Sequence, residues 1–250
     1  MNKVIDISQL KTSCKNCSLS DLCLPHGLEQ DDLEILDSVV KQKTPMQAGD
    51  HLFREDHRGK AVYAIRSGAL KSYQIAKDGT ERVIGFHLPG ELVGFDYLAD
   101  DNHHCSATAL VTSSVCELPL ANLDRLSGDI PGLQRQLIRI MSGEMNADRD
   151  LLFMLAKKSA EERLASLLLS LSSRYQKRGL SGDEFILPMS RTDIASYLGL
   201  TTETVSRLFS HFQDQGILTV ERKSISIQDG VGLRKLVTDC AGNTDNAISM

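Results

Sequence analysis

The chain has 250 residues, of which 41% are hydrophobic, and this length and apolar content suit two domains rather than one. The formal net charge of -5 argues against indiscriminate binding to nucleic acid, which depends on a general excess of Lys and Arg. No apolar run approaches the ~18 residues of a membrane span, and the first residues lack a signal-peptide pattern. We therefore expect a cytoplasmic protein without a membrane partner.

Three of the six cysteines lie close together near the N-terminus, in the stretch CKNCSLSDLC. Cys14, Cys17 and Cys23 have the spacing C-x2-C-x5-C. In a reducing cytoplasm, cysteines at such spacing are more often metal ligands or redox groups than disulfide partners. Structural zinc sites and four-iron clusters both take four protein ligands, so a fourth ligand is required.

The residues alone leave the fourth ligand open. His26 would complete a tetrahedral zinc site, which would be structural and redox-inert. Cys105 follows His103 and His104, which makes a zinc or mixed ligand set conceivable. Cys116, in TSSVCELP, ends a predicted strand just before the segment that leads to a long helix. A remaining cysteine, at position 240, lies in a polar C-terminal stretch and is a poor candidate.

A short amphipathic helix is predicted within EQDDLEILDSVVKQ, and the pattern then changes to short apolar segments between about residues 45 and 120. Glycines punctuate these segments, and KDGT at 77–80 is the clearest hairpin turn, because an Asp-Gly pair readily adopts positive φ values. This spacing predicts a β-sandwich or barrel. The predicted strands are HLFRE, AVYAIRSG, ALKSYQIA, ERVIGFHL, SATALV and SSVCELPL.

A long helix is predicted from Pro131 to residue 157. One stripe of this helix has the alternating spacing of three and four that is typical of a two-stranded coiled coil, although a core-facing helix would show a similar pattern. The stripe contains a carboxylate, which would need a partner in a buried core but would face its own copy in a symmetric dimer. The predicted dimer stripe is Ile138, Met141, Met145, Asp148, Leu152 and Leu155.

A second amphipathic helix is predicted from 160 until Gly179, and a helix-turn-helix follows in RTDIASYLGLTTETVSRLFSHFQDQG. Ala195 lets two helices cross closely, Gly199 permits a left-handed turn, and Val205 packs the second helix on the first. An ordinary helical hairpin with a glycine turn is the alternative. The motif predicts that the second helix enters the major groove of DNA.

The start and exposed face of that second helix favour DNA binding. Thr201 and Thr202 are good capping residues. Glu203 can accept a hydrogen bond from cytosine, Ser206 can bond either way, and Arg207 can pair with guanine through two hydrogen bonds. The segment ILTVERKSISIQ then predicts a hairpin wing with a charged tip.

The DNA-binding segment has no excess of basic residues. Residues 159–230 hold eight Lys or Arg and nine Asp or Glu, so the segment is not basic. We therefore expect affinity to depend on a dimer that engages two half-sites together.

The combination of a β-roll, a long dimer helix and a winged helix-turn-helix containing ETVSR resembles the CRP/FNR family of regulators over nearly the whole chain. The resemblance implies an α+β protein with a cyclic-nucleotide-domain-like jelly roll as sensor domain. The family's PGEL is present at 89–92, but Cys105, Ser106 and Ala107 stand where cyclic-nucleotide binders carry an arginine that clamps the phosphate. A buried phosphate would lack its counter-ion, so we expect no cyclic nucleotide.

This resemblance implies the following boundaries: a cluster-binding segment at 1–30, a β-roll at 31–130, a dimerisation helix at 131–157, a winged helix-turn-helix at 158–231 and a polar tail at 232–250.

Within the family, the N-terminal cysteine spacing and a distant VCE are similar to the oxygen-sensing FNR subgroup. That resemblance implies one 4Fe-4S cluster per subunit, held by Cys14, Cys17, Cys23 and Cys116. Cys105 and the cysteine at 240 are then ordinary thiols.

The resemblance also implies a homodimer that binds palindromic DNA when it carries the cluster, contacts RNA polymerase and controls genes of anaerobic metabolism. The implied half-sites resemble TTGAT, read by Glu203, Ser206 and Arg207. Thr202 replaces an arginine of the catabolite-activator proteins, so a half-site different from theirs is expected. Loops of the β-roll, including Lys77 to Thr80, are candidates for the polymerase contact.

Two other functions are compatible with parts of this pattern. One is a small-ligand-responsive regulator in which the cysteines hold structural zinc. The other is a redox enzyme or electron carrier, which would need a substrate pocket or a second redox centre. The sequence offers no Gly-rich nucleotide loop and no catalytic constellation, so we expect that the protein is not an enzyme.

Overall fold

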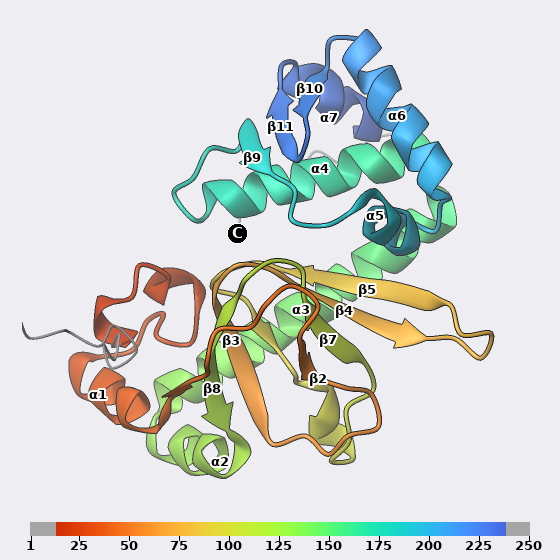
Figure 1. Ribbon diagram of the computed structural model, residues 1–250. Coiled ribbons are helices and arrows are strands. Elements are labelled where there is room, and N and C mark those ends of the chain that lie inside the picture. The colour runs from red at the N-terminus through yellow and green to blue at the C-terminus, as the bar shows by residue number, and fades with distance from the viewer. Residues whose placement is uncertain (1–13, 239–250) are drawn as a thin grey trace, which may run out of the picture. The chain divides into compact units, whose positions relative to one another are not determined.

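The computed structural model describes residues 14–238, which belong to two compact units divided after Met145, inside the long helix α3 (Figure 1). Each unit is described separately. No helix in the described part of the chain is long and apolar enough to cross a membrane.

The first unit contains a β-roll flanked by short helices, as the glycine-punctuated strand pattern predicted. Its helical elements are η2 (Cys14–Asn16), η3 (Ser20–Leu22), α1 (Gln30–Val39), η4 (Asp96–Ala99), α2 (Leu120–Asp129) and the first part of α3 (Pro131–Lys157). Its strands are β1 (Lys41–Gln42), β2 (His51–Phe53), β3 (Ala61–Ser67), β4 (Leu70–Ile75), β5 (Glu81–His87), β6 (Leu92–Val93), β7 (Ser106–Ala109) and β8 (Ser114–Pro119).

These strands form two antiparallel four-stranded sheets, with the orders β1-β8-β3-β6 and β2-β7-β4-β5. The predicted hairpin at KDGT joins β4 to β5: Ala76 N donates to Thr80 O at 2.9 Å, and Gly79 has a φ of 82°. Thr80 N also donates to Asp78 Oδ1 at 2.9 Å, which stabilises the turn through its own side chain. The roll topology and this turn are therefore confirmed.

Two apolar clusters form the core of the first unit. One lies among the strands and includes Phe53, Tyr63, Ile65 and Leu70. The other joins the roll to the helices around it, and Cys23 and Cys116 pack against its edge. Its buried members are Leu24, Leu36, Val39, Val62, Ala64, Leu92, Leu118, Leu126, Ile130, Leu133 and Leu137. This second cluster is what holds the cysteine-bearing segment, which Figure 1 shows beside β3 and β8, on the roll.

The second unit is a winged helix-turn-helix. Besides the rest of α3 it contains α4 (Ala160–Gln176), β9 (Glu184–Ile186), α5 (Arg191–Leu198), α6 (Thr202–Asp214), β10 (Leu218–Glu221), β11 (Ser224–Ile227) and α7 (Gly230–Thr238). The wing strands β10 and β11 pair antiparallel, and β9 adds a third strand beside β11. The predicted wing is present.

Local side chains define the ends of the helix-turn-helix. Ser190 and Asp193 form a capping box at the start of α5, and Gly199 ends that helix with a left-handed φ of 65°. Thr201 then caps α6, because its hydroxyl accepts from Thr204 N at 3.1 Å. Val205 is fully buried between the helices, as its position in the motif required.

The structure differs from the sequence expectations at several places, among them the strand β1, which lies at the end of the stretch predicted as a helix, and β6, which was not predicted. Residues 230–238, which include the start of the expected polar tail, form α7, because Leu233 is fully buried in the second unit. Helix α2 occupies a stretch for which no element was predicted. Cys116 lies inside β8, paired with Gln42 and Ala64, rather than at the end of a strand. The cysteine at 240 lies outside the described residues.

Candidate metal centre and nucleic-acid interface

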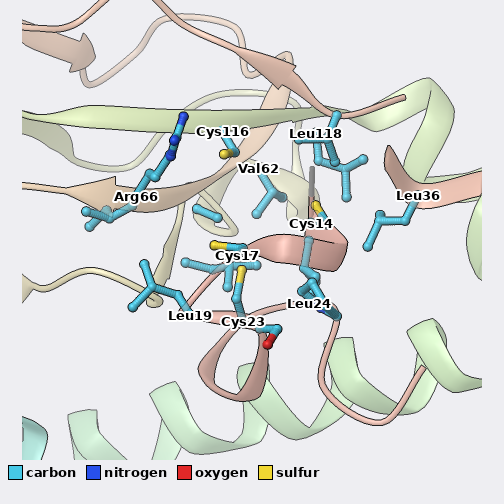
Figure 2. A pocket seen from close by; sticks show the side chains of 16 residues that line it. Cys14, Cys17, Leu19, Cys23, Leu24, Leu36, Val62, Arg66, Cys116 and Leu118 are labelled. Atoms are coloured by element: carbon cyan, nitrogen blue, oxygen red, sulfur yellow. The ribbon is translucent and has the colours of Figure 1, made fainter. Parts of the chain in front are cut away.

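The structure brings Cys14, Cys17, Cys23 and Cys116 to one pocket in the first unit. Figure 2 shows their four sulfurs around the same space. The rest of the lining is almost entirely apolar: Leu19, Ser20, Leu24, Pro25, Leu36, Val40, Val62, Ala64, Ile65, Arg66, Leu92 and Leu118. Three of the sulfurs come from consecutive turns of the N-terminal segment and the fourth from β8, so only the packing of that segment on the roll unites them.

Main-chain hydrogen bonds give the cysteine segment its looped shape. Cys17 N donates to Cys14 O at 3.2 Å, and His26 N donates to Cys23 O at 3.2 Å. The start of the loop is tied to α1, because Cys14 N donates to Asp37 Oδ1 at 2.6 Å. Leu24 is buried with only 3% of its surface exposed and holds the far end of the loop in the core. The segment is therefore ordered by its own contacts as well as by any ligand.

Burial controls the protonation of these thiols. It raises the pKa of Cys23 to about 12, and burial followed by the nearby Asp37 carboxylate raises the pKa of Cys14 as well. Burial also raises the pKa of Cys116, but the positive charge of Arg66 opposes that shift. Metal binding to these residues must release protons, because thiolates rather than thiols are the ligands. Arg66 supplies a positive charge where ligand thiolates would gather negative charge.

The donor set consists of four cysteine sulfurs, which as thiolates are the ligands that a four-iron cluster takes. Within the described residues, no three His, Cys, Asp or Glu side chains converge closely enough to hold one metal ion. A zinc ion would draw four donors to about 2.0–2.3 Å from one centre. The four sulfurs share one pocket whose other walls are almost entirely apolar, which suits a group held by thiolates and limits access by solvent. His26 is not among the residues that line the pocket.

Cys105 lies in a different part of the β-roll. It is buried in the strand cluster, and its Sγ donates to Asp96 Oδ2 at 3.5 Å. The other oxygen of Asp96 lies 3.0 Å from Nδ1 of the buried His103, whose ring stacks on Phe53. This polar network satisfies its members internally. The structure therefore brings neither Cys105 nor its neighbouring histidine to the cysteine pocket.

The predicted base-reading residues share the exposed face of α6. Arg207 Nη2 and Glu203 Oε1 form an ion pair at 2.5 Å, with side chains 77% and 71% exposed. The hydroxyl of Ser206 donates to Thr202 O at 2.8 Å, one turn earlier, which leaves its lone pairs available as acceptors. Thr202 is also exposed. Opposite them, Phe209 and Phe212 are buried, so the helix presents one polar face and one core face.

The predicted dimer stripe is largely open to solvent in the single chain. Ile138, Met141 and Met145 are exposed in the first unit. In the second unit Leu152 is 68% exposed, and Leu155 is half-buried. Asp148 is exposed as well. Large apolar side chains that repeat along one helix and face water indicate an unfilled interface.

Sequence reasoning missed three residues that the structure makes prominent. Arg66 lines the cysteine pocket, Gln136 reaches the cysteine segment from α3, and Arg163 bonds to three main-chain carbonyls in the second unit. None belongs to a motif. Arg66 and Gln136 act through partners that are close only in the folded chain. Arg163 joins two nearby carbonyls to the distant Leu198 O, an arrangement that depends on how α5 packs.

Comparison with known proteins gives family matches in both units and relatives that align with most of the chain. Residues 43–128 match the cyclic nucleotide-binding domain family, and residues 162–236 match the Crp-like helix-turn-helix domain family. The fumarate and nitrate reduction regulatory protein of Escherichia coli (strain K12) is 48% identical over 233 residues, which cover 93% of this chain and 92% of that protein. The protein of the same name from Yersinia pestis is 48% identical over 92% of this chain and 90% of its own length.

A solved structure supports the same relationship. FixK2 from Bradyrhizobium japonicum is 32% identical, with a TM-score of 0.74, and the match covers 82% of this chain and 100% of that one.

Proposed function

Because the chain belongs to the CRP/FNR family of transcription regulators, within its FNR subgroup, we propose that it is an oxygen-responsive regulator that binds palindromic DNA as a homodimer when it carries a 4Fe-4S cluster. The observation that supports this most directly is the gathering of four cysteines around one apolar pocket. Membership of the family makes the chain a DNA-binding regulator rather than an enzyme. Family membership does not by itself establish the response to oxygen, which is our proposal.

In this proposal Cys14, Cys17, Cys23 and Cys116 hold the cluster as thiolates, and Arg66 offsets part of the negative charge that four thiolates bring. When bound, the cluster supplies an oxygen-sensitive redox centre. The apolar pocket walls restrict water and oxygen to a limited path. The chain's own contribution is therefore to hold the ligands together in an environment that slows access.

DNA recognition is proposed for Thr202, Glu203, Ser206 and Arg207 on α6. Their exposure and their common face support this role, and the half-site is proposed to resemble TTGAT. Because the segment is not basic, two half-sites must be engaged by one dimer for useful affinity. The dimer is proposed to form through the stripe on α3, with Asp148 opposite its own copy.

Three further parts of the proposal concern partners and location. We propose no cyclic-nucleotide ligand, since Cys105, Ser106 and Ala107 provide no cation for a phosphate where β7 begins. RNA polymerase is a proposed partner, with the β4–β5 turn at Lys77 to Thr80 as one candidate contact. A cytoplasmic location is proposed because the target is chromosomal DNA.

The proposal is tested on protein isolated without oxygen. We expect about four iron atoms and four acid-labile sulfides per chain, a dimer in sedimentation velocity, and binding to a palindromic TTGAT duplex. Admission of air should remove the cluster signal, the dimer and the DNA binding together. Stoichiometric zinc without sulfide, or a dimer indifferent to air, would contradict the proposal and favour a regulator with a structural metal.

A further inference from the structure

We propose that Gln136 is the positioning residue that couples the cysteine segment to the dimer helix, so that self-association responds to whether the segment holds its metal group. The inference rests on the proposed function and names the contact through which that site acts. Gln136 is neither a proposed ligand nor part of the predicted dimer stripe. Its proposed coupling role rests on the hydrogen bond that its side-chain amide makes.

The Gln136 side chain makes one specific contact with the cysteine segment. Its Nε2 donates to the main-chain O of Cys23 at 3.1 Å, across 113 residues of sequence. Gln136 is only 8% exposed, although a glutamine on a helix usually faces water. A buried amide donor requires a partner, so the hydrogen bond favours one position of the Cys23 main chain relative to α3.

Neighbouring residues on the same face of α3 bring the segment close. Gly132 lies one turn before Gln136, and a Cβ at Gly132 would lie 2.9 Å from Leu28 Cδ2, so the segment approaches α3 closely at this turn. Leu133 and Leu137 belong to the apolar cluster against which Cys23 packs. The segment thus rests on α3 through apolar packing, with one directional hydrogen bond at its centre.

The opposite side of the same helical turns carries the start of the predicted dimer stripe. Ile138 and Met141 follow Gln136 by two and five residues and are exposed. Apolar packing tolerates small slips, whereas a hydrogen bond is lost when its donor and acceptor separate by a fraction of an ångström. A change in the Cys23 main chain is therefore transmitted to this turn of α3 chiefly through the Gln136 amide.

The coupling predicts how association should change. When four thiolates are bound, the position of Cys23 is restrained by its own side chain, and the Gln136 amide holds the helix to that position. When the ligand is lost, Cys23 is restrained only by its main-chain hydrogen bonds and its apolar packing. Without the amide, both forms of the protein should place α3 similarly and associate similarly.

The experiment compares Gln136→Met, which keeps the length of the side chain but cannot donate, with Gln136→Lys, which can. Gln134→Met is the matched control, because Gln134 lies on the same helix and is exposed. Full-length proteins are prepared without oxygen, and iron and sulfide are counted. Dimer dissociation constants are then measured by sedimentation before and after exposure to air.

We expect Gln136→Met to keep the iron and sulfide content of the parent while the ratio of its two dissociation constants falls about tenfold, the effect of losing one hydrogen bond worth roughly 1.4 kcal/mol. Gln136→Lys should keep most of the parent ratio, and Gln134→Met all of it.

A parent-like ratio in Gln136→Met, or an equal loss in the Met and Lys variants, would overturn the inference. Loss of iron from Gln136→Met would overturn it too, because Gln136 would then retain the ligand loop rather than couple it. A parent protein that never assembles iron and sulfide would instead contradict the proposed function itself.

Discussion

Arg207 and Glu203 are joined by an ion pair of 2.5 Å between Nη2 and Oε1 on the exposed face of α6, so the two proposed base-reading side chains bind each other in the free protein. An exposed pair of this kind stabilises a helix by only a few tenths of a kcal/mol. The ion pair matters more for DNA binding than for stability. Each side chain must leave or share its partner when it contacts a base edge, and the pair restrains Arg207 before it meets DNA.

Arg207→Ala should weaken binding to the operator by about 1–3 kcal/mol per half-site and relax the preference at one guanine, because it removes a contact that reads guanine through two hydrogen bonds. Glu203→Ala should change the preferred base at its own position. Fluorescence anisotropy on operators with single base changes, with random DNA as reference, measures both effects. Equal weakening on operator and random DNA would show that these residues contact phosphates only.

Cys116→Ser should abolish stable binding of the cluster, because a hydroxyl is a much poorer ligand for iron than a thiolate. The same loss is expected for serine at Cys14, Cys17 or Cys23. Cys105→Ser is the matched control, since Cys105 is also a buried thiol of the β-roll but bonds to Asp96 instead of lining the pocket. Iron and acid-labile sulfide analysis shows whether each variant retains the cluster. Retention of iron by Cys116→Ser, with loss in Cys105→Ser, would show that the fourth ligand was wrongly chosen.

Asp148→Ala should dimerise and bind the operator in air, without a cluster. In a symmetric dimer, two Asp148 carboxylates about 5 Å apart would repel by roughly 3 kcal/mol at an effective dielectric constant near 20. Removing that repulsion changes association by more than the ~1.4 kcal/mol that corresponds to a tenfold change. Asp148→Asn should act in the same direction but less strongly, because an amide still needs a partner. Aerobic sedimentation of Asp148→Ala as a monomer like the parent would refute the repulsion model.

Arg163→Met should lower the free energy of unfolding of the second unit by about 3 kcal/mol, because hydrogen bonds from a charged donor are among the strongest in proteins. Arg163 donates to Lys158 O at 2.9 Å, Leu198 O at 3.0 Å and Leu155 O at 2.8 Å, and so joins the ends of α3 and α5. Urea unfolding followed by circular dichroism measures the loss.

Two further variants test whether the geometry of Arg163 matters. Arg163→Lys should recover only part of the stability, because one ammonium cannot reach three carbonyls in a fixed plane. Lys177→Met, on an exposed residue just after α4, should cost less than about 1 kcal/mol. A loss in Arg163→Met no larger than in Lys177→Met would mean that water replaces these contacts.

The metal-free protein should lose stability as the pH rises above the ordinary thiol pKa of 9.0. Burial raises the pKa of Cys23 to about 12, and that of Cys14 and Cys116 rises in the same direction. Above pH 9.0 the unfolded chain therefore loses thiol protons that the folded chain keeps. Stability falls wherever the folded state binds more protons and the pH rises. Urea unfolding at about pH 8 and about pH 10 measures the change.

The double variant Cys14→Ser and Cys23→Ser is the control for this pH effect, because serine does not titrate in that range. It should lose less stability than the parent between the two pH values. Tyr63, whose pKa burial raises to about 12, acts in the same direction and remains in both proteins. An equal loss in parent and variant would show that the cysteine segment leaves the roll before its thiols ionise.

Local patterns in the sequence were sufficient for much of the fold. Alternating apolar residues and glycines predicted the strands of the roll, and the Asp-Gly pair at 78–79 predicted the β4–β5 turn. Gly199 and Thr201 predicted the turn of the helix-turn-helix and the start of α6. These signals are reliable because they act between residues that are neighbours in the chain. They reflect backbone preferences and capping, which need little from the rest of the molecule.

Only tertiary packing decided which distant residues share a site. The residues by themselves left His26, Cys105 and Cys116 as candidates for the fourth ligand, and a family resemblance favoured Cys116. Its place beside the other cysteines follows from how the N-terminal segment packs on β8, where burial of Leu24 and Leu36 outweighs any local preference. The Gln136 amide meets the Cys23 main-chain carbonyl for the same reason, because groups separated by 113 residues become neighbours only when an apolar core brings their segments together.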